Sequence, residues 1–239
     1  MALERTLIVI PALNEQRRIG ELLSGIRRAA PGVSLLVVDD GSRDATASIA
    51  AAAGARVVSH PFNLGYGAAL SSGYRYALRA GFGRVIQMDA DGQHDPESLA
   101  RIGERLDDGV DLVLGSRFLH AESYRPPLAR RIGILLFSGL VSLALGRRIS
   151  DATTGFQGLS ASLLGFYTQQ GSFPADYPDA NILIRCGRAG FRIEEVPVRM
   201  RANPDGGTLH VGLKPLVYIL RMLFAVAIES TRRLPRGVS

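Results

Sequence analysis

The chain has 239 residues, which suits one large α/β domain or two small ones with a sizeable core. Its formal charge of +6 comes from arginine, since Lys214 is the only lysine; this favours phosphate-rich substrates or an anionic membrane surface, whereas the scattered basic residues disfavour nucleic acid as a partner. The single cysteine, Cys186, excludes an intramolecular disulfide framework and is expected to be a small buried hydrophobe in a reducing, cytoplasmic location.

The first half of the chain alternates short apolar runs with helical patterns, and no signal-peptide pattern precedes the first run. Runs this short and this rich in Val, Ile and Leu are typical of parallel strands buried on both faces. The pattern therefore predicts a doubly wound α/β fold, a mainly parallel sheet flanked by helices. The predicted strands are Leu7–Ile10, Leu35–Val38, Val57–Ser59, Val85–Met88 and Leu112–Leu114, and the predicted helices are Arg17–Ala30, Ala45–Ala53, Ala68–Ala80 and Pro96–Leu106.

Capping residues agree with these boundaries. Asp95 precedes Pro96 in the arrangement typical of a helix start, and Ser42 or Asp44 is placed to cap the helix at Ala45–Ala53. Functional loops of such folds lie at the carboxyl ends of the strands. In this chain those ends carry the polar loops Pro11–Glu15, Asp39–Ser42, Asp89–Asp95 and Gly115–Phe118.

The second half contains two strongly apolar helical stretches, at about Arg131–Leu145 and Leu213–Ile228. Neither reaches the roughly 20 uninterrupted apolar residues that a spanning helix needs. Basic residues flank both, so we expect interfacial helices that lie against anionic headgroups. The alternative is that both are ordinary core or dimer helices.

The strand Val85–Met88 delivers two carboxylates, Asp89 and Asp91, one residue apart at its end. Oxygen ligands placed in this way suit Mg²⁺ or Mn²⁺, and such an ion neutralises the charge on a departing nucleotide diphosphate. A second strand ends in Asp39 and Asp40, where a carboxylate is placed to accept hydrogen bonds from a base or ribose. We expect one of these two to serve only as a helix cap.

Five segments in chain order resemble the family 2 glycosyltransferases of GT-A fold, a Rossmann-like mainly parallel sheet. They are Pro-Ala-Leu-Asn-Glu from Pro11, Val-Val-Asp-Asp-Gly-Ser from Val37, Asn-Leu-Gly-Tyr-Gly from Asn63, Asp-Ala-Asp-Gly-Gln from Asp89 and Gly-Ser-Arg-Phe from Gly115. The segment Asp151–Gln157 and the two apolar helices are similar to the dolichyl-phosphate mannose synthase and polyprenyl-phosphate glycosyltransferase branch.

The resemblance implies inverting transfer of a sugar from a UDP- or GDP-sugar, with Mg²⁺ or Mn²⁺, to a polyprenyl (dolichyl-type) phosphate. It implies one GT-A domain over residues 1–239, with a nucleotide-sugar half at 1–118 and an acceptor half at 119–239. Carried over by motif, the nucleotide-sugar residues are Pro11, Asn14, Glu15, Asp39, Asp40, Asp89 and Arg117; the metal residues are Asp89, Asp91 and Gln93; and the acceptor-phosphate residues are Arg117, Arg131 and Arg201.

Asp91 and Asp151 are the predicted catalytic residues. A phosphate acceptor is already a nucleophile near pH 7, so Asp151 is expected either to act as a base or to bind and orient. Asp176 and Asp179 are rival carboxylates for this role.

The segment after Gly206-Gly207-Thr208 departs from the branch, because Leu209 and His210 stand where relatives carry small polar or basic residues. Because neither apolar stretch is long enough to span a membrane, we expect a peripheral protein at the inner face of the cell membrane, acting alone, as a homo-oligomer or with a separate membrane partner. The alternative is a soluble family 2 glycosyltransferase that acts on a small-molecule or glycan hydroxyl. A dinucleotide-dependent oxidoreductase is disfavoured, because Gly65 and Gly67 lack the third glycine of that fingerprint.

Overall fold

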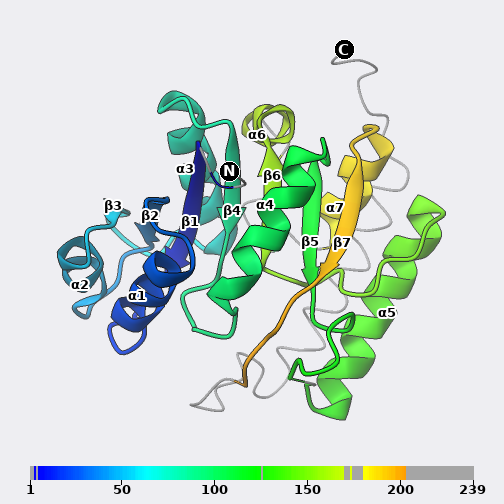
Figure 1. The fold of residues 1–239 in the computed structure, drawn as a ribbon, viewed down its shortest axis with the longest axis horizontal. Coiled ribbons are helices and arrows are strands. Elements are labelled where there is room, and N and C mark those ends of the chain that lie inside the picture. Colours follow the sequence, from blue (N-terminus) through cyan, green and yellow to red (C-terminus); the bar gives the residue numbers. More distant parts are fainter. Residues whose placement is uncertain (1–2, 4, 125, 170–172, 174–179, 203–239) are drawn as a thin grey trace.

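The computed structural model describes residues 3, 5–124, 126–169, 173 and 180–202. Seven strands form one sheet in the order β3-β2-β1-β4-β6-β5-β7 (Figure 1). The strands are β1 Thr6–Ala12, β2 Ser34–Asp39, β3 Arg56–Ser59, β4 Arg84–Gln87, β5 Leu112–Ser116, β6 Gln157–Ser160 and β7 Ile193–Pro197. The helices are α1 Ile19–Ala29, α2 Thr46–Ala52, α3 Tyr66–Arg79, α4 Leu99–Asp107 after a 3₁₀ turn at Pro96–Ser98, α5 Leu128–Leu145, α6 Ala161–Thr168 and α7 Ala180–Arg188.

The mainly parallel α/β sheet is confirmed, as are all five predicted strands. Two further strands were not predicted. Strand β6 runs antiparallel to both β4 and β5, and β7 pairs parallel with β5 at the edge of the sheet. In β6 the backbone of Gly158 lies so close to α4 that a Cβ there would be 2.4 Å from Cγ2 of Ile102. Because β6 needs a glycine at this close contact, it has no continuous apolar run, and the sequence pattern did not predict it as a strand.

The core has two layers, one on each face of the sheet. Alternate residues of β1 point to opposite faces, so Leu7 and Val9 join one layer while Ile8 and Ile10 join the other. Buried residues of α3, α5, α6 and α7 cover the first face, and those of α1 and α4 cover the second. Both faces are therefore dry, which explains the nearly continuous apolar runs in the central strands.

The predicted helix caps can be assigned individually. Asp95 accepts a hydrogen bond from the backbone N–H of Glu97, as its position before Pro96 predicted. Of the two candidates at α2, Asp44 accepts from the N–H of Thr46 at 3.0 Å, whereas the hydroxyl of Ser42 accepts from the N–H of Asn14. Cys186 is buried as expected, and burial raises the pKa of its thiol to about 12.

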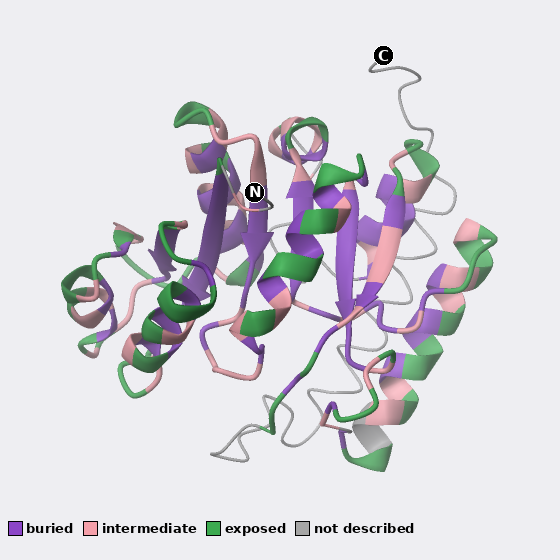
Figure 2. Cartoon of the chain, viewed as in Figure 1, coloured by how far each residue is buried: buried purple, intermediate pink, exposed green. Residues whose placement is uncertain are grey.

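The first apolar stretch is confirmed as a helix, α5. Its inner side buries Ile134, Phe137 and Val141, and its outer side is exposed (Figure 2). The exposed large apolar residues of α5 are Leu128, Ile132, Leu135, Leu136 and Leu143. Among the described residues no helix has the length and apolar content to cross a bilayer. The second predicted stretch, residues 213–228, lies outside the described residues.

The approach of α3 to the sheet yields a stability prediction. A Cβ on Gly73 would lie 2.4 Å from Cγ1 of Val9 and 3.5 Å from Cγ2 of Val38, both in the core. Gly73→Ala should therefore lower the free energy of unfolding by about 1–3 kcal/mol, because the overpacked strand must shift. Gly165→Ala in α6 is the control, since nothing lies within 4 Å of its Cβ. Helix propensity alone should make that variant neutral or up to about 1 kcal/mol more stable. Urea unfolding of both variants measures the difference.

Candidate active site

Two loops, at the carboxyl ends of β1 and β2, are joined by hydrogen bonds between the side chains of one loop and the backbone of the other. The hydroxyls of Ser42 and Thr46 and the carboxylate of Asp44 accept from three successive N–H groups of the first loop, and the side chains of Asn14 and Gln16 accept from two N–H groups of the second. Asn14 holds a left-handed conformation, with φ of 57°. The structure thus brings the predicted residues Pro11, Asn14, Glu15, Asp39 and Asp40 to one edge of the sheet, and the amide of Asn14 is part of the loop contact itself.

The two carboxylates after β2 have different environments, although both are buried. Asp40 accepts hydrogen bonds from Nδ1 of His60 at 2.7 Å and from the N–H groups of Leu64 and Gly65, each at 2.9 Å. Asp40 therefore fixes the loop that leads into α3. Asp39 accepts from the N–H of Ser42 at 3.2 Å. We expected one of the pair to cap the next helix, α2, but that helix has no side-chain cap of this kind; Asp40 instead holds the backbone that precedes α3.

Asp89 and Asp91 follow β4, as predicted. Asp89 accepts from the hydroxyl of Tyr66 at 2.8 Å, and its second oxygen lies 3.6 Å from Nε2 of His94. Burial lowers the pKa of His94 to about 4, so the ring is neutral at pH 7. Because Nδ1 of His94 accepts from the N–H of Asp89, the ring proton is on Nε2 and points toward the Asp89 carboxylate. Stacking on Phe156, at 4.9 Å between centroids, holds the ring in place.

The carboxylate of Asp91 is destabilised in the folded chain. Burial, followed by the negative charge of Asp89, raises the pKa of Asp91, while the N–H of Gln93 donates to it at 2.9 Å. A divalent cation between the two carboxylates would relieve this repulsion. Among the described residues no cluster of three or more acidic, histidine or cysteine ligands exists. Two carboxylates suit Mg²⁺, which commonly takes its other ligands from substrate phosphates and water.

Gly155 brings the loop before β6 against this pair. A Cβ at Gly155 would lie 2.4 Å from one carboxylate oxygen of Asp89, so any other residue would displace the carboxylate. Gln93, a predicted metal residue, lies beside Asp91, and its backbone carbonyl accepts from the N–H of Arg201 at 2.8 Å. Gln93 is thus near the carboxylate pair, and its role as a ligand stays a prediction.

A buried ion pair joins the end of β5 to the loop before β6. Nε of Arg117 donates to Oδ2 of Asp151 at 2.7 Å, and the backbone N–H of Arg117 donates to the same oxygen at 3.3 Å. Asp151 is 0% exposed and Arg117 is 8% exposed. Asp151 is therefore placed to orient Arg117 and not to take a proton from an arriving substrate, which favours the second of its two predicted roles.

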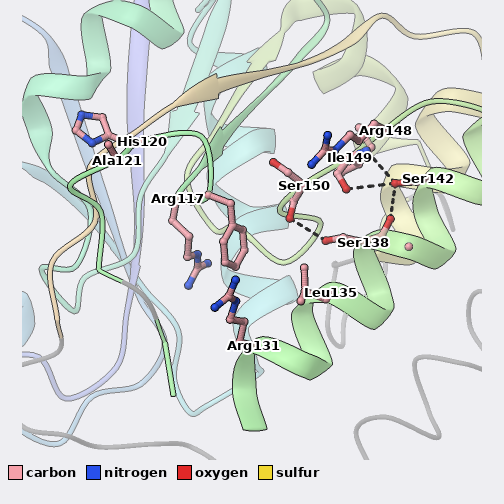
Figure 3. Close-up of a pocket in the computed structure, with 12 residues that line it drawn as sticks. Arg117, His120, Ala121, Arg131, Leu135, Ser138, Ser142, Arg148, Ile149 and Ser150 are labelled. Atoms are coloured by element: carbon pink, nitrogen blue, oxygen red, sulfur yellow. Dashed lines mark hydrogen bonds between the residues drawn. The ribbon is translucent and has the colours of Figure 1, made fainter. Parts of the chain in front are cut away.

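The Arg117 guanidinium faces a cavity of about 440 Å³ between this loop and α5 (Figure 3). Its head group and that of Arg131 point toward one another, and Nε of Arg131 is buried with no hydrogen-bond partner among the described residues. Arg148 lines the same cavity; it is one of the basic residues that flank the first apolar stretch and was not predicted as a site residue. The full lining is Arg117, Phe118, His120, Ala121, Arg131, Leu135, Ser138, Gly139, Ser142, Arg148, Ile149 and Ser150.

The structure brings together only two of the three arginines predicted for the acceptor phosphate. Arg117 and Arg131 line the cavity, whereas the guanidinium of Arg201 lies 3.5 Å from Asp95, next to the loop of Asp89 and Asp91. The rival carboxylates Asp176 and Asp179 and the segment from Gly206 to His210 lie outside the described residues.

Comparison with known proteins gives consistent matches. Residues 7–165, more than half of the chain, match the family described as Glycosyl transferase family 2. The chain is 32% identical over 203 residues to polyprenol monophosphomannose synthase of Mycolicibacterium smegmatis, covering 82% of this chain and 77% of that protein. It is 32% identical over 196 residues to dolichyl-phosphate hexose transferase of Haloferax volcanii, covering 81% and 82%.

The fold also matches solved structures. One is glucosyl-3-phosphoglycerate synthase of Mycobacterium tuberculosis in complex with Mn²⁺, UDP and glucosyl-3-phosphoglycerate, with a TM-score of 0.68 and 24% identity, covering 99% of this chain and 85% of that one. At this identity the likeness confirms the GT-A fold.

The repulsion between the carboxylates yields a second prediction. Because the pKa of Asp91 lies above its ordinary value of 3.8, the charged carboxylate disfavours the folded state: this cost is absent below pH 3.8, grows between pH 3.8 and the raised pKa, and is constant above the raised pKa. Asp91→Asn keeps the acceptor for the N–H of Gln93 and removes the charge. Without divalent ions at pH 7, it should raise Tm on the order of 2–4 °C, equivalent to about 1 kcal/mol.

The same variant should lose any rise in Tm that MnCl₂ gives the unsubstituted protein. Scanning fluorimetry at pH 3.5 and pH 7, with and without MnCl₂, measures both effects. A lower Tm for Asp91→Asn at pH 7 would contradict the electrostatic account.

Proposed function

The chain belongs to glycosyl transferase family 2, and on that premise we propose that it moves a sugar from a UDP- or GDP-sugar to a polyprenyl-type phosphate with a divalent cation. The observation that carries the proposal is an arginine-lined cavity beside a pair of carboxylates at a strand end. The two are neighbours, since Gly155, in the loop that carries Asp151, packs directly against the carboxylate of Asp89. A phosphate acceptor and a nucleoside diphosphate donor need these two environments side by side.

The names of the relatives support the acceptor more than the sugar. They specify polyprenol, undecaprenyl and dolichyl acceptors, while their sugars include mannose, a hexose and N-acetylglucosamine. Bound UDP with Mn²⁺ in the structural relative supports a divalent cation at Asp89 and Asp91, with Gln93 beside them. We assign Pro11, Asn14, Glu15, Asp39 and Asp40 to the wall that receives the nucleoside.

The chemistry is an inverting displacement at the anomeric carbon. An oxygen of the acceptor phosphate attacks, the new C–O bond forms on the face opposite the leaving group, and the bond from the anomeric carbon to the donor diphosphate breaks. Arg117 and Arg131 bind the acceptor phosphate, offsetting its repulsion from the donor, and Asp151 orients Arg117. The acceptor oxygen is already ionised near pH 7, so no side chain has to remove a proton. When bound, the cation supplies charge neutralisation of the leaving nucleoside diphosphate.

The lipid end of such an acceptor requires the protein to reach a membrane surface. We propose that the exposed side of α5 provides this contact at the inner face of the cell membrane. Ile132 is 58% exposed, Leu143 is 82% exposed, and Leu135 both is exposed and lines the cavity. An isoprenoid chain could therefore leave the cavity along the apolar side of α5.

A transfer assay tests the function. Labelled UDP- and GDP-sugars are incubated with MgCl₂ or MnCl₂ and either undecaprenyl phosphate in detergent or water-soluble sugars and phosphoglycerate. We expect label in the organic phase. Label recovered only in the aqueous product would instead support the soluble glycosyltransferase, the second candidate.

Arg131→Ala should raise KM for undecaprenyl phosphate at least about tenfold, because a charge-assisted contact worth about 1.5–3 kcal/mol is lost. KM for the donor should change little. Arg101→Ala is the matched control. Arg101 is an exposed residue of α4 that donates to the carbonyl of Pro197 in β7 and does not line the cavity. Equal changes in the two variants would count against the assigned phosphate site.

Ile132→Glu with Leu136→Glu should reduce sedimentation with anionic phospholipid vesicles by at least about threefold, since burying a charge at an apolar interface is costly. Ala51→Glu with Ala52→Glu introduces the same two charges at exposed positions of α2, which packs on the other face of the sheet. It should leave sedimentation unchanged. If the α5 variant sediments as well as the unsubstituted protein, α5 is not the membrane contact.

A further inference from the structure

Residues 148–150 line the arginine-lined cavity, and the segment that they begin, from Arg148 to Ala152, is bound from two sides. From α5, the hydroxyl of Ser138 donates to the carbonyl of Ser150 at 3.2 Å (Figure 3). The same hydroxyl accepts from the N–H of Ala152 at 3.1 Å. The hydroxyl of Ser142 accepts from the N–H of Ile149 at 2.9 Å. The opposite side of the segment is held from β7.

Glu195 of β7 supplies that second attachment. One carboxylate oxygen accepts from the N–H of Ser150 at 3.0 Å, the hydroxyl of Ser150 at 2.9 Å and the N–H of Asp151 at 3.0 Å. The other oxygen accepts from the N–H of Ser150 at 2.8 Å. Among the described residues Glu195 forms no ion pair with a basic side chain, so its charge is satisfied by this one turn of backbone.

The two residues that Glu195 holds are the two that contact the end of β5. The hydroxyl of Ser150 lies 2.7 Å from that of Ser116, and Asp151 forms the buried pair with Arg117. Ser150 and Asp151 of the loop thus contact the adjacent residues Ser116 and Arg117 at the end of β5, and the carboxylate of Glu195 holds Ser150 and Asp151 in place. A shift of this turn would move the Asp151 carboxylate and with it the Arg117 head group.

We infer that Glu195 is a positioning residue for the acceptor site: it sets the Arg117 guanidinium in the cavity through Ser150 and Asp151 without touching substrate. The inference rests on the proposed function, in which that guanidinium binds the acceptor phosphate. A mere contribution to folding would lower stability and weaken donor and acceptor use together. Positioning predicts a selective effect on the acceptor.

The chain offers a matched control one residue away. Glu194 is also a partly exposed carboxylate of β7, but it pairs with Arg105 at 2.7 Å and Arg192 at 2.6 Å, on the other face of the sheet. Glu194→Gln and Glu195→Gln make the same chemical change in the same strand. In Glu195→Gln an amide NH₂ must face the N–H of Ser150 or of Asp151, which displaces the turn.

Initial rates are measured with undecaprenyl phosphate and with the donor as the varied substrate. Glu195→Gln should raise KM for the acceptor roughly tenfold, the scale expected of a small misplacement of a binding group. KM for the donor, and the rise in Tm that UDP or GDP gives with MnCl₂, should match those of Glu194→Gln. In an Arg117→Lys background, Glu195→Gln should add little, because the two changes act through one guanidinium.

Equal effects of the two glutamine variants, or a tenfold additive loss in the Arg117→Lys background, would overturn the inference. If Glu195→Gln does not fold, Ser150→Ala replaces it; this variant removes the hydroxyl contacts to Glu195 and Ser116 and should raise the same KM in the same selective way. Titration with farnesyl phosphate separates the two claims. Absence of transfer by the unsubstituted protein, together with weaker farnesyl phosphate binding in Glu195→Gln only, would overturn the function and leave the role of Glu195 standing.

Discussion

The arginine-lined cavity depends on one buried ion pair, Arg117 with Asp151. A carboxylate with no exposed surface is tolerated only when it is paired and hydrogen-bonded, and removing one partner of such a pair typically costs about 3–5 kcal/mol. The pair ties the end of β5 to the loop before β6. Because Asp151 takes Nε and the backbone N–H of Arg117, the remaining guanidinium nitrogens are directed toward the cavity. This one ion pair thus stabilises the loop and orients the guanidinium of Arg117.

The first half of the fold could be predicted from the sequence because β1, β2, β4 and β5 are buried on both faces and are therefore rich in Val, Ile and Leu. The edge strand β3 is only partly buried and carries the shorter apolar pair Val57 and Val58. Strands β6 and β7 lack such apolar runs, and for this reason they were not predicted. In β6 the sequence Gln-Gly-Leu-Ser meets the needs of close helix approach, and in β7 two adjacent glutamates interrupt any apolar pattern. Those glutamates have partners more than 40 residues away, which a local reading has no means of finding.

The candidate site shows the same division. Strand ends followed by acidic residues predicted where Asp39, Asp40, Asp89 and Asp91 would gather, since topology alone brings those ends to one edge. The hydrogen-bond and charge partners of each carboxylate could not be predicted. Asp40 is fully engaged by His60 and two backbone N–H groups, whereas Asp91 sits beside another negative charge. The place of Arg201 beside Asp95, and that of Arg148 in the cavity, could not be predicted for the same reason: the fold alone brings the end of β5, α5 and the loop before β6 around one cavity and leaves Arg201 outside it.

The five bonds between the loops after β1 and β2 bear on how tightly a nucleotide could be held there. Fixing the backbone of one residue costs about 1–2 kcal/mol in conformational entropy, and a loop that orders only on binding subtracts that cost from the affinity. In this molecule the ordering has already happened during folding. Even Asn14, in its left-handed conformation, is held by partners on the other loop. The two loops are therefore preorganised. The free energy of contacts to an incoming nucleotide would contribute to affinity with little of it offset by the entropy cost of ordering the loops.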